Sequence, residues 1–114
     1  MSYYLFLDDV RTVKMVYPQM QETDFVVVRD YETFVTNILQ KGLPNFISFD
    51  NDLGLNSKGN VAKDGYDCAK WLVYQSNLNL KPLKFKVHSA NPIAKIQIES
   101  LLNNYIKHLI NLKE

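Results

Sequence analysis

The sequence has a single cysteine, four glycines, four prolines and no long hydrophobic run. Cys68 cannot form an internal disulfide, which agrees with a reducing cytoplasm. The first apolar stretch, residues 3–7, is too short for a signal-peptide core or a membrane span, and two aspartates follow it directly. We therefore expect a cytoplasmic protein with no membrane segment.

An excess of charge of either sign is also missing. The formal net charge is +1 and the sequence pI is about 7.8. No global field would attract the chain to nucleic acid, so we predict no extended nucleic-acid surface and expect any phosphate recognition to be local. The chain has 114 residues, 46% of them hydrophobic, and no internal repeat. This is enough to bury one core, and we predict a single domain over residues 1–114.

Four segments have the composition of β-strands. Residues 3–7, 25–28 and 46–49 are continuous apolar runs, as expected of strands buried on both faces in a parallel sheet. Residues 83–87 alternate instead, with lysines at the polar positions. Outward lysines discourage pairing with another chain, so the alternation predicts an edge strand.

Three segments have helical signals. Asp30 can cap a helix that Gly42 stops, and Asp64 can cap a second helix over about residues 65–75. Asn91 followed by Pro92 is a strong start for a third helix, which runs nearly to the end of the sequence. Residues 53–63 lie between the third strand and the second helix and read as a loop.

The segment from residue 10 to residue 24 is long enough for a crossover between the first two strands. Pro18 and weak periodicity argue against a full helix there. We expect its apolar side chains to cover the edge of the sheet irregularly; they are Val13, Met15, Val16 and Met20. The order of elements predicts a three-layer α/β fold with a four-stranded parallel sheet in the order 2-1-3-4 and no fifth strand.

Acidic residues follow two strands that this order makes neighbours. Asp8 and Asp9 leave the first strand, and Asp50 and Asp52 leave the third. The crevice of an open parallel sheet lies beyond the carboxyl ends of its strands, so these carboxylates would converge and repel one another unless a cation neutralised them. Oxygen ligands favour Mg²⁺ or Mn²⁺. Each aspartate alone could simply cap a loop, but the doublet together with Asp50 and Asp52 favours a metal site.

Polar residues also follow the fourth strand. Ser89 and Asn91 open the last helix, where backbone N–H groups favour an anion, although capping alone would equally explain Asn91. His88 has a pKa suited to acid–base catalysis, and ordinary packing is the alternative. Arg11 could either pair with Asp9 or clamp a phosphate. We predict Asp50, His88 and Ser89 as catalytic, and Arg11, Ser89 and Asn91 as phosphate-binding.

The arrangement resembles the phosphoacceptor site of response-regulator receiver domains, which have a flavodoxin-like fold. The resemblance rests on the acid pair after the first strand, the aspartate after the third and Ser89-Ala90 after the fourth. It implies that Asp8 and Asp9 hold Mg²⁺, that Asp50 is a phosphoacceptor or metal ligand, and that Ser89 contacts the phosphoryl group. Receivers carry a lysine before a fifth strand, and this sequence has neither.

A closer resemblance is to cyclic-phosphate processing receiver domains, a shortened receiver-like family. Its motifs read L-D-D-x-R, S-x-D-H-D-L-G, D-G and V-H-S-A-N-P. They match, in order, Leu7 to Arg11, Ser48 to Gly54, Asp64-Gly65 and Val87 to Pro92. Asn51 stands where the family usually has histidine. The resemblance implies a metal-dependent phosphoesterase acting on cyclic phosphates of nucleotides or RNA ends.

Two other functions remain open from the sequence. A receiver-type switch would accept a phosphoryl group on Asp50 and change its binding to a partner. A binding module would hold a nucleotide or phosphate without chemistry. The sequence does not identify a protein partner.

Overall fold

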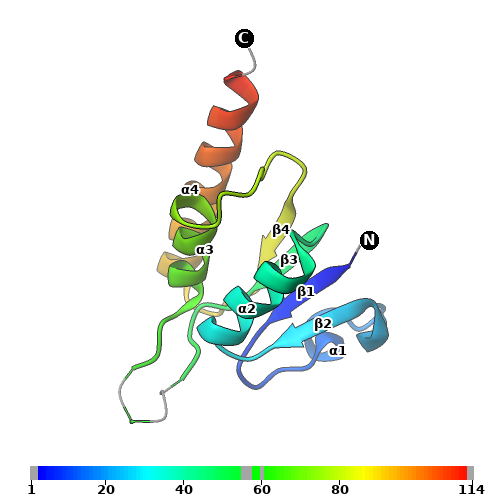
Figure 1. Cartoon of the computed structure of the whole chain (residues 1–114). Helices are drawn as coiled ribbons and strands as arrows, with labels where there is room; N and C mark the ends of the chain where they lie inside the picture. The colour runs from blue at the N-terminus through cyan, green and yellow to red at the C-terminus, as the bar shows by residue number, and fades with distance from the viewer. Residues whose placement is uncertain (1–2, 55–57, 60, 113–114) are drawn as a thin grey trace.

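The computed structural model describes residues 3–54, 58–59 and 61–112. Its elements in chain order are β1 (Tyr4–Leu7), α1 (Val13–Val16), a 3₁₀ turn (Glu22–Asp24), β2 (Phe25–Val28), α2 (Tyr31–Lys41), β3 (Phe46–Phe49), α3 (Gly65–Tyr74), β4 (Lys84–Val87) and α4 (Pro92–Asn111). Figure 1 shows them coloured along the chain. Residues 55–57 and 60 of the predicted loop lie outside the described part.

The sheet has the order predicted from the sequence. All strand pairs are parallel, and the order is β2-β1-β3-β4. The fold is therefore the α/β receiver-like fold, with four strands among the described residues. β4 is an edge strand, and its two lysines are exposed, as the alternation predicted.

Side-chain caps begin the three long helices at the predicted residues. The carboxylate of Asp30 accepts a hydrogen bond from the backbone N–H of Thr33, and that of Asp64 accepts one from Asp67. The amide oxygen of Asn91 accepts from the N–H of Ala94. Each cap satisfies a donor that the first helical turn leaves without a partner, which explains why these boundaries were predictable.

The main core lies between the sheet and α2, α3 and α4. Leu5 and Leu7 of β1, together with Ile47 and Phe49 of β3, point to this side and are fully buried. Trp71 of α3 packs edge-on against Phe34 of α2. Cys68 is also fully buried here, and burial raises the pKa of its thiol well above the usual value, so it is a packed core residue.

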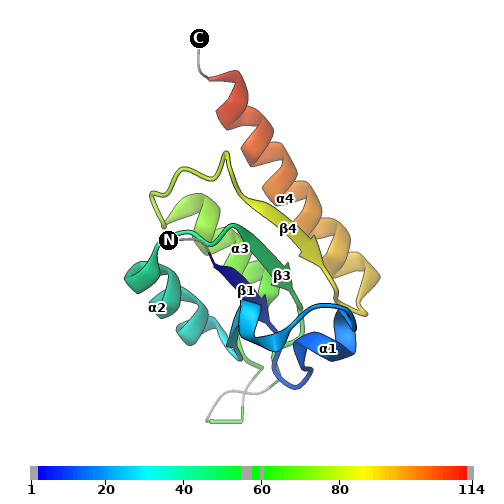
Figure 2. The same ribbon diagram turned by 90° about the vertical axis from the view of Figure 1, so that its right-hand side faces the viewer.

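The opposite face of the sheet has a thinner cover. Val13 of α1 packs with Phe6 and Phe25 in a second, smaller cluster. In Figure 2 the short α1 lies on the other side of the strands from α2 and α3. As predicted, no full helix forms in this segment, and Val13, Val16 and Met20 pack on the sheet, with one capped helical turn at α1. The prediction was wrong for Met15, which is 68% exposed. Its sulfur accepts a hydrogen bond from the N–H of Thr12.

No helix among the described residues is long and apolar enough to cross a membrane.

Candidate functional site

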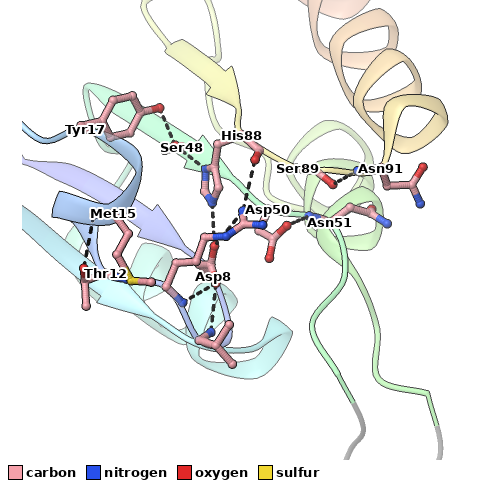
Figure 3. A network of polar contacts seen from close by, with 12 residues as sticks. Asp8, Thr12, Met15, Tyr17, Ser48, Asp50, Asn51, His88, Ser89 and Asn91 are labelled. Carbon is pink, nitrogen blue, oxygen red and sulfur yellow. Dashed lines mark hydrogen bonds and ion pairs between the residues drawn. The ribbon is translucent and has the colours of Figure 1, made fainter.

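Asp8, Asp50 and His88 come together at the carboxyl ends of three neighbouring strands (Figure 3). One potential ligand atom from each lies within 4.8 Å of the others. The parallel pairing continues one residue past the strands, because the N–H of Asp50 donates to the carbonyl of Leu7 and that of His88 donates to the carbonyl of Phe49. The ends of the sheet are therefore held in register, which fixes these three side chains.

Asp8 is the most enclosed member of this acidic cluster, with no exposed surface. Its Oδ1 accepts hydrogen bonds from the backbone N–H groups of Val10 and Arg11, at 2.9 and 2.8 Å. Its Oδ2 lies 2.9 Å from Nε2 of His88. Burial alone would raise the pKa of Asp8, but these hydrogen bonds together outweigh it and lower the pKa. Asp8 is thus ionised at neutral pH.

The pKa of Asp50 is displaced in the opposite direction from that of Asp8. It is 7% exposed, and among the described residues the one backbone donor to its carboxylate is its neighbour Asn51, at 2.8 Å. Burial, followed by the negative charge of Asp8, raises the pKa of Asp50 to about 6. Two adjacent carboxylates with pKa values displaced in opposite directions are typical of sites where one group holds charge and the other exchanges a proton near neutral pH.

His88 is held from both sides. Its Nδ1 lies 2.6 Å from the hydroxyl of Ser48, which lies 2.7 Å from the hydroxyl of Tyr17. Its ring is stacked on Phe6, with centroids 4.9 Å apart. Burial lowers the pKa of His88, so the ring is neutral and can carry one proton. Because the carboxylate of Asp8 can only accept, that proton is on Nε2, and the hydroxyls of Tyr17 and Ser48 donate in sequence toward Nδ1.

Sequence reasoning gave Ser48 and Tyr17 no role in the site. Ser48 is fully buried in the middle of β3, and Tyr17 follows α1. Two signals could have indicated Ser48: it is the first residue of the family motif that ends at Gly54, and the alternation of side chains along β3 places residues 48 and 50 on one side of the sheet. No sequence signal pointed to Tyr17.

Arg11 lies beside Asp8 rather than in a contact with Asp9. Its Nη1 is 3.6 Å from Oδ2 of Asp8 and donates to the carbonyl of His88 at 3.3 Å. Its side chain is 34% exposed, and its charge works against the rise in the pKa of Asp50. Arg11 is positioned both to balance the charge of Asp8 and to meet a ligand from solvent.

The other two predicted metal ligands lie farther out. Oδ2 of Asp9 faces Gly54, where an added Cβ would come within 3.2 Å of it, and its charge contributes to raising the pKa of Asp50. Asp52 is exposed, and its Oδ1 accepts a hydrogen bond from the side-chain amide of Asn51 at 3.2 Å. Neither belongs to the group formed by Asp8, Asp50 and His88.

Ser89 and Asn91 lie at the start of α4. The hydroxyl of Ser89 accepts a hydrogen bond from the N–H of Asn91 at 3.0 Å, and Asn91 caps the helix. Figure 3 shows His88 turned toward Asp8 and Ser89 turned toward Asn91. The two neighbours therefore point to different partners, as side chains do at the end of a strand.

Asn51 and Gly65 join the end of β3 to the start of α3. The side-chain oxygen of Asn51 accepts from the N–H of Tyr66 at 3.1 Å, and Asn51 is 5% exposed. The N–H of Gly65 donates to the carbonyl of Asn51, and a Cβ at Gly65 would lie 2.0 Å from the carbonyl oxygen of Asp50. Only glycine permits this approach, which explains the Asp64-Gly65 pair in the sequence.

Fold and site together define a receiver-like α/β domain with a buried acidic cluster beyond the carboxyl ends of its strands. The chain belongs to the cyclic-phosphate processing receiver domain family, whose profile matches residues 3–104. No curated protein matches the chain.

A solved structure shares the fold. It is a fusion of the yeast Spc42 trimeric coiled coil to another structure, and it aligns with a TM-score of 0.57 and 16% identity over 98% of this chain and 79% of the other. At this identity the likeness concerns the fold alone.

Proposed function

We propose that this chain is a phosphoesterase that opens cyclic phosphates on nucleotides or RNA ends. The observation that carries the proposal is the convergence of Asp8, Asp50 and His88 within 4.8 Å, with the pKa of Asp50 raised to about 6. The family to which the chain belongs is described as processing cyclic phosphates, which supports this class of substrate.

The donor set fits a divalent metal ion such as Mg²⁺ or Mn²⁺. Asp8 and Asp50 offer buried carboxylate oxygens, which hard cations prefer. Burial and then the negative charge of Asp8 raise the pKa of Asp50, and a cation would offset that negative charge. Nε2 of His88 is engaged by Asp8, so His88 would orient this carboxylate as an outer partner. When bound, such an ion would polarise a phosphoryl oxygen and acidify water.

Asp50 is the proton-transfer group in this proposal. Its carboxylate takes a proton from the water that attacks phosphorus, and a new P–O bond forms. The ester bond to one ribose oxygen then breaks, and Asp50 returns the proton to that oxygen. A pKa of about 6 leaves Asp50 ionised at neutral pH and able to take this proton, and a cation bound beside it would favour the ionised form further.

Arg11 and Ser89 are the groups proposed to bind the phosphate. The guanidinium of Arg11 is partly exposed next to Asp8 and can stabilise negative charge that develops on the phosphoryl oxygens. Ser89 and the first turn of α4 contribute a hydroxyl and a positive helix end. His88 acts through Asp8 as a positioning residue, since both of its ring nitrogens have partners within the protein.

The test is incubation of the purified chain with 2′,3′-cyclic nucleotides and cyclic-ended RNA, with Mn²⁺ or Mg²⁺ and again with chelator. We expect metal-dependent release of a nucleoside monophosphate end and its loss in Asp50→Asn. Asp30→Asn is the matched control, because it makes the same change at a helix cap where asparagine serves equally well. Absence of metal-dependent turnover on all substrates would falsify the proposal.

A receiver-type switch is the second candidate, and the place of Asp50 directly after β3 favours it. In that case acetyl phosphate would add one phosphoryl group to Asp50. Intact-mass measurement on the wild-type chain and on Asp50→Asn distinguishes the two functions. A ligand-induced rise in melting temperature without turnover or adduct would instead indicate a binding module.

A further inference from the structure

The acidic cluster is the last row of a ladder that crosses the thinly covered face of the sheet. Tyr4 is paired with Phe46, which is paired with Lys84. The next row on this face, two residues further along the strands, is Phe6, Ser48 and Lys86. The row after that is the acidic cluster, with Asp8, Asp50 and His88. Alternate residues of a strand share a face, so these nine side chains lie on one side of the sheet.

The cover from α1 does not extend over the whole of this face. A groove of about 510 Å³ remains at the amino-terminal ends of β1, β3 and β4, within the range of ligand pockets. Its lining is aromatic and basic; the residues are Tyr4, Tyr17, Met20, Asn45, Phe46, Pro82, Lys84 and Lys86. Among the described residues that line it, none is acidic.

The lining has the chemistry of a site for a single nucleic acid strand. Tyr4 is 37% exposed and stands edge-on to Phe46, so its ring is accessible for stacking on a base. Lys84 and Lys86 are exposed and two residues apart, which separates them by roughly 6.6 Å along the strand. That spacing is close to the backbone step of one nucleotide in an extended strand.

The groove and the acidic cluster lie along the same strand. Lys86 is two residues before His88, so a chain that follows β4 from the cluster meets Lys86 first and Lys84 next. We infer that the groove binds the nucleotides of a single-stranded RNA that precede a terminal cyclic phosphate, which Arg11 and Ser89 hold beside the acidic cluster. The inference rests on the proposed function and narrows the substrate from free cyclic nucleotides to RNA ends.

The lysines also have a simpler role, since charge on an edge strand prevents pairing with other sheets. Substitution by glutamate separates the two roles. Glutamate keeps a charge on the edge strand β4, but its negative charge repels phosphate instead of attracting it. The double variant Lys84→Glu and Lys86→Glu is therefore the main test. The control is the double variant Lys41→Glu and Lys107→Glu, at exposed positions on α2 and α4, because it changes the net charge by the same amount.

The first measurement needs no catalysis. Fluorescence anisotropy follows a labelled hexaribonucleotide with a plain 3′-phosphate binding to the full chain in chelator. The two lysine–phosphate contacts are expected to contribute about −1.4 to the slope of the logarithm of the affinity against the logarithm of salt concentration. We expect the double variant to bind at least about tenfold more weakly with a slope that is shallower by about 1.4, Tyr4→Leu to bind about tenfold more weakly, and the control double variant to bind as wild type does.

The second measurement compares turnover of a cyclic-ended hexaribonucleotide with that of a 2′,3′-cyclic mononucleotide. We expect the hexamer to have the lower KM, and the double variant to lose this advantage while its kcat on the mononucleotide is unchanged. RNA binding that depends on the lysines, without any turnover, would support RNA binding by the groove and would contradict the proposed phosphoesterase activity. Equal KM values for the two substrates, together with unchanged RNA binding in the double variant, would overturn the proposal that the groove binds RNA. The proposal would also be overturned if the wild-type chain formed dimers and the double variant were monomeric, because the lysines would then serve a contact between two copies.

Discussion

Nε2 of His88 lies 2.9 Å from Oδ2 of Asp8, and this contact joins the end of the edge strand β4 to that of β1 across β3. Together with the backbone N–H groups of Arg11 and Val10, which have the larger effect, it lowers the pKa of Asp8 and keeps this carboxylate ionised. The fixed charge of Asp8 is in turn the second cause, after burial, of the raised pKa of Asp50. The difference between the two aspartates therefore originates in the hydrogen bonds on Asp8, from the backbone of Arg11 and Val10 and from a histidine 80 residues away in sequence.

Asp50→Asn should stabilise the chain above pH 6 when no metal is present. The pKa of Asp50 is raised in the folded state, so its contribution to stability is fully present below the unfolded value near 4 and is lost as pH rises through about 6. Asparagine does not titrate. We expect the variant to gain ~2 kcal/mol in free energy of unfolding at pH 8 and almost nothing at pH 4.

Urea denaturation in chelator between pH 4 and pH 8 measures this difference, and Asp30→Asn is the control that should show no such pH dependence. Adding Mg²⁺ at pH 8 should stabilise wild type more than Asp50→Asn. A constant difference between wild type and Asp50→Asn at all pH values would contradict the raised pKa.

Ser48→Ala should destabilise the chain more than Tyr17→Phe. Ser48 is fully buried between two polar partners, and its loss leaves Nδ1 of His88 and the hydroxyl of Tyr17 without a hydrogen bond. We expect a loss of about 2–3 kcal/mol for Ser48→Ala and about 1 kcal/mol for Tyr17→Phe, which keeps the ring and the contact between Ser48 and His88. Equal losses of stability in the two variants, measured by urea denaturation, would show that Ser48 does not link Tyr17 to His88 through hydrogen bonds.

Gly65→Ala should be far more harmful than Gly59→Ala. A Cβ at Gly65 would lie 2.0 Å from the carbonyl oxygen of Asp50, so α3 or the end of β3 must move, at a cost of about 3 kcal/mol or more. Gly59 has a φ of +82° but nothing within 4 Å of an added Cβ, and alanine there costs only the backbone strain of about 1–2 kcal/mol. Thermal unfolding of both variants gives the comparison, and a similar loss in the two would argue against the close approach.

Asn51→His should leave turnover within about threefold of wild type, although it introduces the residue usual in the family. The side chain at position 51 is buried toward the first turn of α3, where it accepts from the N–H of Tyr66. An imidazole in this place can accept the same hydrogen bond, so the variant should lose about 1 kcal/mol of stability from repacking. A hundredfold gain in kcat on a cyclic nucleotide would instead assign residue 51 to proton transfer.

The sequence alone was sufficient for most of the fold. Apolar runs and the caps at Asp30, Asp64 and Asn91 are local signals, and each depends on residues within one turn or one strand. The sheet order followed from the pattern of elements and the handedness of their connections. The segment at 10–24 was the exception, because its single helical turn is stabilised by packing on Phe6 and Phe25 and not by its own periodicity.

The sequence alone determined the candidate site only in part. The sequence located Asp8, Asp9, Asp50 and Asp52 at strand ends, but neighbouring side chains there point to different sides, and their positions in the chain do not say which of them meet. Strand register decided it: pairing of β1 with β3 and β4 aligned Asp8 and Asp50 with His88 and left Asp52 exposed. Register also placed Ser48 beside His88, and the packing of α1 on the sheet brought Tyr17 to Ser48. These hydrogen bonds join segments far apart in the sequence, so they exist only once the tertiary structure has formed.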